Sequence, residues 1–99
     1  MGSRVLNLLL HGRENAQTAR ELAHILNIKP RIISRNIHNL RVRDKIVICS
    51  CNTGRNKGYF LPENDEEISH FVRSMYSRIR EIAAAVAPAK KYLADRGGE

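Results

Sequence analysis

The chain has 99 residues, which is enough for one compact domain with one appended element and only a modest core. Lys and Arg number 17 against 10 Asp and Glu, and the excess lies in residues 1–62, which hold 11 basic and 3 acidic side chains. This charge favours a polyanion as a partner of the first part, and no apolar run is long enough to predict a membrane span.

The first predicted element is a helix over residues 4–10, with Ser3 as its N-terminal cap and Gly12 after its end. Its side chains are apolar almost all round, so we expect it to be largely buried. The following residues 13–17 are polar, and Asn15-Ala16 is expected to add a very short strand.

Two short helices joined by a tight turn are predicted next, over residues 17–41. Thr18 and Glu21 have the spacing of a capping box, which starts the first of these helices. Asn27 tolerates the left-handed conformation that commonly ends a helix, and Pro30 suits the first turn of the next one. The apolar residues of the first helix recur at helical spacing: Ala19, Leu22, Ala23 and Leu26.

The second of these helices, residues 30–41, has two different faces. Ile33, Ile37 and Leu40 form one apolar stripe. The opposite side carries cations and hydrogen-bonding groups: Arg31, Arg35 and His38, with Ser34 and Asn39 on the flanks. One buried face and one cationic face is what a helix in the major groove of DNA requires.

The period then changes to that of a β-hairpin. Residues 46–49 form a short, mainly β-branched run that favours a strand. Residues 50–58 are rich in turn formers, and residues 59–61 are predicted as the returning strand, which Pro62 ends. The loop carries Arg55, Asn56 and Lys57 and no acid. A basic loop beside a recognition helix is suited to phosphates or the minor groove, although an ordinary solvated hairpin loop is the alternative.

A long C-terminal helix is predicted from Asn64 or Asp65, where Asn64 and Glu67 form a second capping box. Its apolar residues are spaced alternately four and three apart: Ile68, Val72, Met75, Ile79, Ile82, Val86, Ala89 and Leu93. This is the pattern of a coiled-coil seam and predicts a homodimer; the alternative is that the helix folds back on its own domain. Pro88 is expected to kink or end the helix near Val86.

The string TARELAHILNIKPRIISRNIHNLR, residues 18–41, resembles the helix-turn-helix of the biotin-repressor-like and DeoR-like winged families. The string GYFLPENDEEISHFVRS, residues 58–74, resembles small winged-helix proteins of bacterial phages and prophages. The resemblance covers about residues 3–75. It implies that Arg31, Ile32, Ser34, Arg35 and His38 face DNA and that Arg55 and Lys57 lie in the wing. Lys29 stands where such families usually place a Ser or Thr cap, and Ile32 where Thr is common.

An enzyme is not expected, and neither is a cofactor. The first 62 residues hold only three acids, Glu14, Glu21 and Asp44, which do not pair at short spacing, and no Gly-rich phosphate loop precedes a helix. Cys49 and Cys51 are too close in sequence to bridge well and have no Cys/His partners at zinc spacing, so we expect free thiols in a cytoplasmic protein.

The sequence therefore predicts a mainly α fold with a small β-hairpin: a winged helix-turn-helix domain over residues 3–62 and a dimerisation helix over residues 64–93. The expected function is binding of double-stranded DNA, as a dimeric transcriptional regulator or DNA-transaction accessory protein of a phage or mobile element, associated with the nucleoid when bound. The residues expected to contact DNA are Thr18, Lys29, Arg31, Ile32, Ser34, Arg35, His38, Asn39, Arg55, Asn56 and Lys57. The residues expected in the dimer interface are Ile68, Val72, Met75, Ile79, Ile82 and Val86.

The alternative function is that of a protein-interaction adaptor on a winged-helix scaffold. An acidic or apolar recognition face would favour it, and the face predicted here is neither. Binding of RNA or single-stranded DNA is a third possibility. Aromatic residues make up only 5% of the chain, so platforms for base stacking are scarce.

Overall fold

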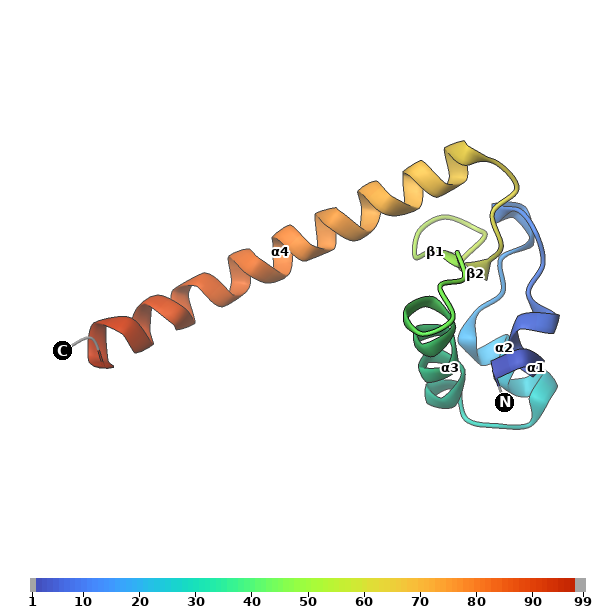
Figure 1. Cartoon of the computed structure of the whole chain (residues 1–99), viewed down its shortest axis with the longest axis horizontal. Helices are drawn as coiled ribbons and strands as arrows, with labels where there is room; N and C mark the ends of the chain where they lie inside the picture. Colours follow the sequence, from blue (N-terminus) through green and yellow to red (C-terminus); the bar gives the residue numbers. More distant parts are fainter. Residues whose placement is uncertain (1, 98–99) are drawn as a thin grey trace.

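The computed structural model of the chain describes residues 2–97. The chain is mainly helical, with one two-stranded hairpin and a long C-terminal helix, as predicted (Figure 1). The elements in order are α1 (Gly2–Leu8), a 3-10 turn (Arg13–Asn15), α2 (Ala19–Leu26), α3 (Pro30–Val42), β1 (Cys49–Cys51), β2 (Gly58–Phe60) and α4 (Asp65–Gly97).

Helix α1 begins and ends two residues earlier than predicted. Ser3 lies inside the helix, so the prediction that it caps the helix is wrong. The helix ends early because Leu10 is drawn to the hairpin, where its carbonyl oxygen accepts a hydrogen bond from the Leu61 N–H at 2.8 Å. Of the leucines in this stretch, Leu9 is buried whereas Leu10 is half exposed, so the helix is less completely buried than its composition suggested.

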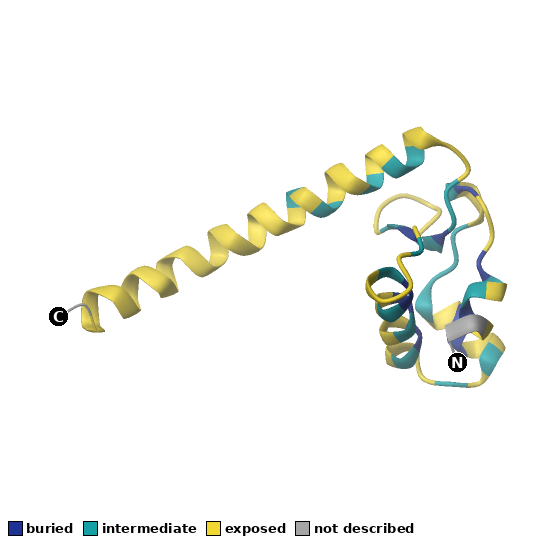
Figure 2. Ribbon diagram, in the orientation of Figure 1, coloured by how far each residue is buried: buried dark blue, intermediate teal, exposed yellow. Residues whose placement is uncertain are grey.

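The core lies between α1, α2 and α3 and closes on the residues just before β1. It consists of Val5, Leu9, Leu22, Ala23, Ile33, Ile37, Leu40 and Ile48 (Figure 2). Ile33 and Ile37 are at most 1% exposed, which confirms the apolar stripe of α3. Because this stripe is fixed against α1 and α2, the opposite side of α3 must face solvent.

The start of α2 and the turn from α2 to α3 have the predicted chemistry. Both bonds of the capping box are present: the Glu21 N–H donates to Thr18 Oγ1 at 3.1 Å, and the Thr18 N–H donates to Glu21 Oε1 at 2.8 Å. Asn27 adopts the left-handed conformation, with φ 56° and ψ 48°. Pro30 occupies the first turn of α3, after Lys29 at the N-cap position, whose side chain makes no capping bond.

The strands of the hairpin are shifted from the prediction. The register pairs Cys49 with Phe60 and Cys51 with Gly58, so β1 starts where the predicted strand over residues 46–49 ends. Residues 46–48 have no partner strand because Leu61, next in register, bonds instead to Leu10 and forms a bridge with His11. The loop between the strands is therefore shorter than predicted. It consists of the exposed residues 52–57, which we call the hairpin tip.

The short third strand predicted at Asn15-Ala16 is wrong. Asn15 belongs to the 3-10 turn, where its Nδ2 donates to the His11 carbonyl oxygen at 2.9 Å. Pairing with β2 occurs one residue later, as an antiparallel bridge between Gln17 and Tyr59. Its two main-chain hydrogen bonds, 3.0 and 2.7 Å long, tie the hairpin to the start of α2.

Helix α4 runs unbroken for 33 residues and extends away from the rest of the chain (Figure 1). Of the two expected effects of Pro88, a kink or an end of the helix near Val86, the end does not occur, because Pro88 lies inside the helix. Pro88 and Ala84, whose carbonyl oxygen loses its helical donor, are both exposed, so water can satisfy that oxygen. Only the first part of α4 lies against the domain, and all described residues from Ile79 onward are exposed (Figure 2).

Candidate nucleic-acid interface

The solvent-facing side of α3 carries the polar residues that the sequence placed there. We call Arg31, Ser34, Arg35 and His38 the outer face of α3, and all four are exposed. Val42 joins this face one turn beyond His38, with 51% of its surface exposed. No acidic residue occurs in α3 or anywhere between Glu21 and Asp44, so the outer face is cationic along its length.

The remaining predicted residues of α3 lie at its edges. Ile32 and Asn39 are only half exposed, because helical spacing places them on one flank between the outer face and the core. Lys29 is exposed at the N-terminal end of α3. These three residues are accessible from the side of the helix and not from the middle of the outer face.

The hairpin tip holds the second group of predicted residues. Arg55, Asn56 and Lys57 are exposed, and no acid occurs between Asp44 and Glu63. The hairpin, with its tip, lies beyond the C-terminal end of α3, because the chain passes from that end of the helix to β1 (Figure 1). The outer face and the tip are therefore two basic surfaces of one small domain.

The structure brings Thr18 and Lys57 together at the base of the hairpin. Both line a hollow of about 300 Å³ with Arg41, Tyr59 and Arg78, which we call the hairpin-base hollow. Three cations from α3, the hairpin and α4 thus surround the N-terminus of α2. The capping box already engages the N–H groups of Thr18 and Glu21, so only those of Ala19 and Arg20 are left for an anion there.

Arg41 is the residue of this region that sequence reasoning missed. Its Nε donates to the Ile48 carbonyl oxygen at 2.9 Å and its Nη2 to Ser50 Oγ at 3.4 Å. The guanidinium lies 5.0 Å from the centre of the Phe71 ring and 5.7 Å from that of Tyr59. Burial lowers the pKa of this guanidinium, which nevertheless stays charged. Arg41 thus joins α3 to the hairpin and to α4. The signal in the sequence was that Arg41 does not belong to the outer face of α3, which indicates a different role from that of Arg31 and Arg35.

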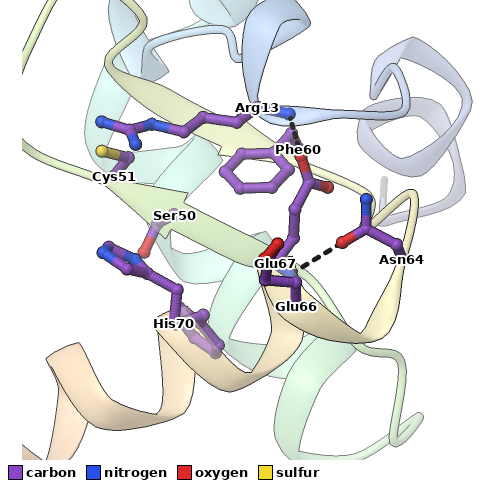
Figure 3. A pocket seen from close by; sticks show the side chains of 9 residues that line it. Arg13, Ser50, Cys51, Phe60, Asn64, Glu66, Glu67 and His70 are labelled. Atoms are coloured by element: carbon purple, nitrogen blue, oxygen red, sulfur yellow. Dashed lines mark hydrogen bonds between the residues drawn. The ribbon is translucent and has the colours of Figure 1, made fainter.

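A second hollow, of about 280 Å³, lies between the hairpin and the start of α4 (Figure 3). Both carboxylate oxygens of Glu67 accept main-chain hydrogen bonds there, from Arg13 N–H at 2.9 Å and from Glu63 N–H at 2.8 Å. Asn64 Oδ1 accepts from the Glu67 N–H at 2.9 Å, which confirms one half of the predicted capping box. The other half is wrong, because the Glu67 carboxylate accepts from the Glu63 N–H instead of the Asn64 N–H. Glu67 therefore holds α4 against the domain.

The two cysteines are free and differ in environment. Cys49 is buried, and its burial is the main cause of a raised thiol pKa. The nearby Glu67 carboxylate raises this pKa further. For Cys51 burial acts in the same direction but is outweighed by hydrogen bonding at Thr53 and by the Arg13 charge, so its pKa is lowered. Within residues 2–97 no group of three or more His, Cys, Asp or Glu side chains is arranged to hold a metal ion.

None of the helices described over residues 2–97 is both long and apolar enough to cross a membrane. Comparison of the chain with protein-family models, curated proteins and solved structures found no match.

Proposed function

We propose that the protein binds double-stranded DNA as a winged-helix domain, with α3 in the major groove. The observation that carries the proposal is the outer face of α3, where Arg31, Arg35 and His38 are all exposed and no acid interrupts them. Arginine can donate two hydrogen bonds to a guanine edge, and the groove is wide enough for one helix. The opposite side of α3 is buried, which fixes the orientation of these side chains.

The hairpin contributes backbone contacts in this proposal. Arg55 and Lys57 lie in an exposed tip with the donors Asn52, Thr53 and Asn56, and side chains of this kind typically bind phosphate oxygens. The hairpin-base hollow is suited to one further phosphate, between Lys57 and Arg78 and next to the N-terminus of α2. These contacts would fix the position of α3 on the duplex without reading sequence.

We further propose that α4 joins two copies of the chain. Its apolar seam is exposed in the single chain, with 56% of Ile79 and 61% of Ile82 accessible to solvent. A dimer would double the number of phosphate contacts and would read two half-sites. By the resemblance of residues 18–41 and 58–74, the role is transcription control or another DNA transaction of a phage or mobile element, at the nucleoid of the host cell.

Fluorescence anisotropy with labelled duplex and single-stranded oligonucleotides tests the proposal. Tighter binding to the duplex is expected, and with about six phosphates neutralised log K should fall against log salt with a slope near −5. Selection from a random-sequence duplex pool would then supply a preferred site. Equal binding to single strands, or an affinity that does not change with salt, would contradict the proposal.

Three single substitutions separate the roles of the cations. Arg35→Ala should weaken binding to the selected site by about tenfold or more. It should also reduce the difference in affinity between the selected site and a random duplex. Arg55→Ala should weaken binding to both duplexes equally and reduce the salt slope by about one. Arg80→Ala is the matched control, because Arg80 is an exposed arginine of α4 outside both surfaces. If Arg35→Ala behaves as the control does, α3 is not the reading helix.

A further inference from the structure

Helix α4 has two stripes that repeat with the same spacing. The first stripe, Glu67, Phe71, Ser74 and Arg78, faces its own domain. Glu67 accepts the hydrogen bond from Arg13, Phe71 lies under Arg41, and Ser74 and Arg78 border hollows shared with the hairpin. The spacings between these residues are four, three and four. This stripe is mostly polar and accounts for the attachment of α4 to the domain.

The apolar seam follows each residue of the first stripe by one position. Ile68, Val72, Met75 and Ile79 come directly after the four residues that face the domain. One residue corresponds to about 100° around a helix, so the seam points about a quarter turn away from the domain. It continues past the last domain contact to Leu93, which is 66% exposed. Ile68 and Met75 at the start of the seam are only partly exposed, whereas Val72 and every seam residue from Ile79 onward are exposed and available to a partner.

We propose that the seam binds the seam of a second copy in the antiparallel direction. The seam residues occupy two alternating heptad positions, a and d. When the two helices are aligned so that paired residue numbers add to 161, every a residue faces a d residue of the other copy. Ile79 then faces Ile82 of the other copy, Met75 faces Val86, Val72 faces Ala89 and Ile68 faces Leu93. In this alignment the smaller Ala89 side chain faces the larger Val72, and every seam residue has a seam residue of the other copy opposite it.

The charges at the two ends of α4 favour the same direction. In this alignment the next layer pairs Asp65, in the first turn, with Arg96, in the last turn. A parallel pair would instead bring the acidic first turns together, Asp65, Glu66 and Glu67 of one copy beside the same residues of the other. Opposite charges across a helix interface select direction and register, and like charges oppose association.

Symmetry gives a third argument, which rests on the proposed function. In an antiparallel pair the two-fold axis is perpendicular to the plane that contains the two helices. Each domain is attached about a quarter turn from the seam, so the two-fold axis places both domains on the same side of that plane. The dyad of a parallel pair runs along the helices and places the two domains on opposite sides. The antiparallel pair therefore presents both domains to one side of the helix pair, which suits two half-sites on a duplex that lies along it.

Cysteine cross-linking in the full chain tests the direction. The background variant carries Cys49→Ala and Cys51→Ser, and Val72→Cys and Ala89→Cys are added to it separately. In the antiparallel pair each cysteine lies 17 positions from its own copy, about 26 Å along the axis, so neither variant alone should form a disulfide dimer. A mixture of the two variants, exchanged before oxidation, should form one. Self-linking of Val72→Cys would overturn the antiparallel direction.

Charge exchange provides a second test that needs no cysteine. Asp65→Lys and Arg96→Glu should each weaken dimerisation by about threefold to tenfold in sedimentation equilibrium, and the double variant should recover it. Glu66→Lys is the matched control in the same helical turn and should weaken dimerisation less. A double variant weaker than either single one would overturn the register.

The same measurements separate this inference from the proposed function. If the unmodified chain sediments as a monomer at all concentrations, the seam has no second copy and the inference fails. Duplex binding by the monomer, measured by anisotropy, would still support the winged-helix assignment. If the dimer forms in the antiparallel direction but no duplex is bound, the inference stands and the proposed function fails.

Discussion

Replacement of Gly58 by alanine is the sharpest test of how the hairpin is held. Gly58 has φ +125° and lies against the segment before α2. An added Cβ would lie 2.2 Å from the carbonyl carbon and oxygen of Gln17 and 2.6 Å from the Thr18 nitrogen. These are main-chain atoms, so no side-chain rotation can relieve the overlap. Either the hairpin or the start of α2 must move.

The cost follows from two terms. An L-residue in this backbone region carries about 1–3 kcal/mol of strain. Separation of the two segments also breaks the two main-chain hydrogen bonds between Gln17 and Tyr59, each worth about 1 kcal/mol. Gly58→Ala should therefore lower the free energy of unfolding by about 3–5 kcal/mol, a large part of the 5–15 kcal/mol typical of a domain.

Urea denaturation followed by far-UV circular dichroism measures this loss, at one fixed protein concentration because association also contributes to stability. Gly54→Ala is the matched control: its φ is +79°, but the nearest atom to an added Cβ is the flexible Arg13 Nη2 at 3.4 Å. The control should lose only about 1 kcal/mol, from the left-handed conformation alone. A Gly58→Ala loss no larger than that of the control would refute the close backbone contact.

Two further predictions concern Arg41 and the cysteines. Arg41→Met should lower the free energy of unfolding by about 2–3 kcal/mol, since the Ile48 carbonyl loses its donor and two aromatic rings lose their cation, whereas Arg43→Met at an exposed position should change it little. Equal losses for the two would show that Arg41 is not a structural link. In the folded protein near neutral pH, iodoacetamide should modify Cys51 well before Cys49, because Cys51 is half exposed and its lowered pKa increases the thiolate fraction, while Cys49 is buried with a raised pKa. Mass spectrometry of the alkylated peptides measures the order, and simultaneous modification would contradict the difference in environment.

The features predicted correctly from the sequence depend on residues close together in the chain. The capping box of Thr18 and Glu21 and the buried stripe of α3 follow from spacings of three or four residues, and the left-handed Asn27 follows from its residue type. The mainly helical fold with one hairpin followed from these local signals. They could be read directly because a helix forms its own hydrogen bonds.

The features that were missed depend on distant partners. The strand at residues 46–49 was misplaced because its register is decided by Leu61, which pairs with Leu10 and His11 instead. Arg41 carries no local sign that Phe71, thirty residues later, will lie beneath it. The effect of Pro88 was overestimated because the sequence does not show whether water can reach the carbonyl oxygen that loses its helical donor.

The candidate site was predicted in composition but not in assembly. The exposure of the outer face of α3 followed from periodicity, and that of Arg55 and Lys57 from turn chemistry. The sequence could not show that Lys57 lies beside Thr18 or that Arg78 of α4 joins them in one hollow. The close approach of Gly58 to Gln17, which places the hairpin beside the start of α2, has no periodic signature in the sequence.

The hairpin tip also has a consequence for how proteins of this design can diversify. All six of its residues are exposed, while the hairpin below is fixed by Gly58 and the bridge between Gln17 and Tyr59. The tip can therefore be exchanged, lengthened or shortened at little cost in stability. Grafting foreign loops at residues 52–57 should therefore yield a set of proteins with one scaffold and different surface charges near the hairpin, with the core unchanged.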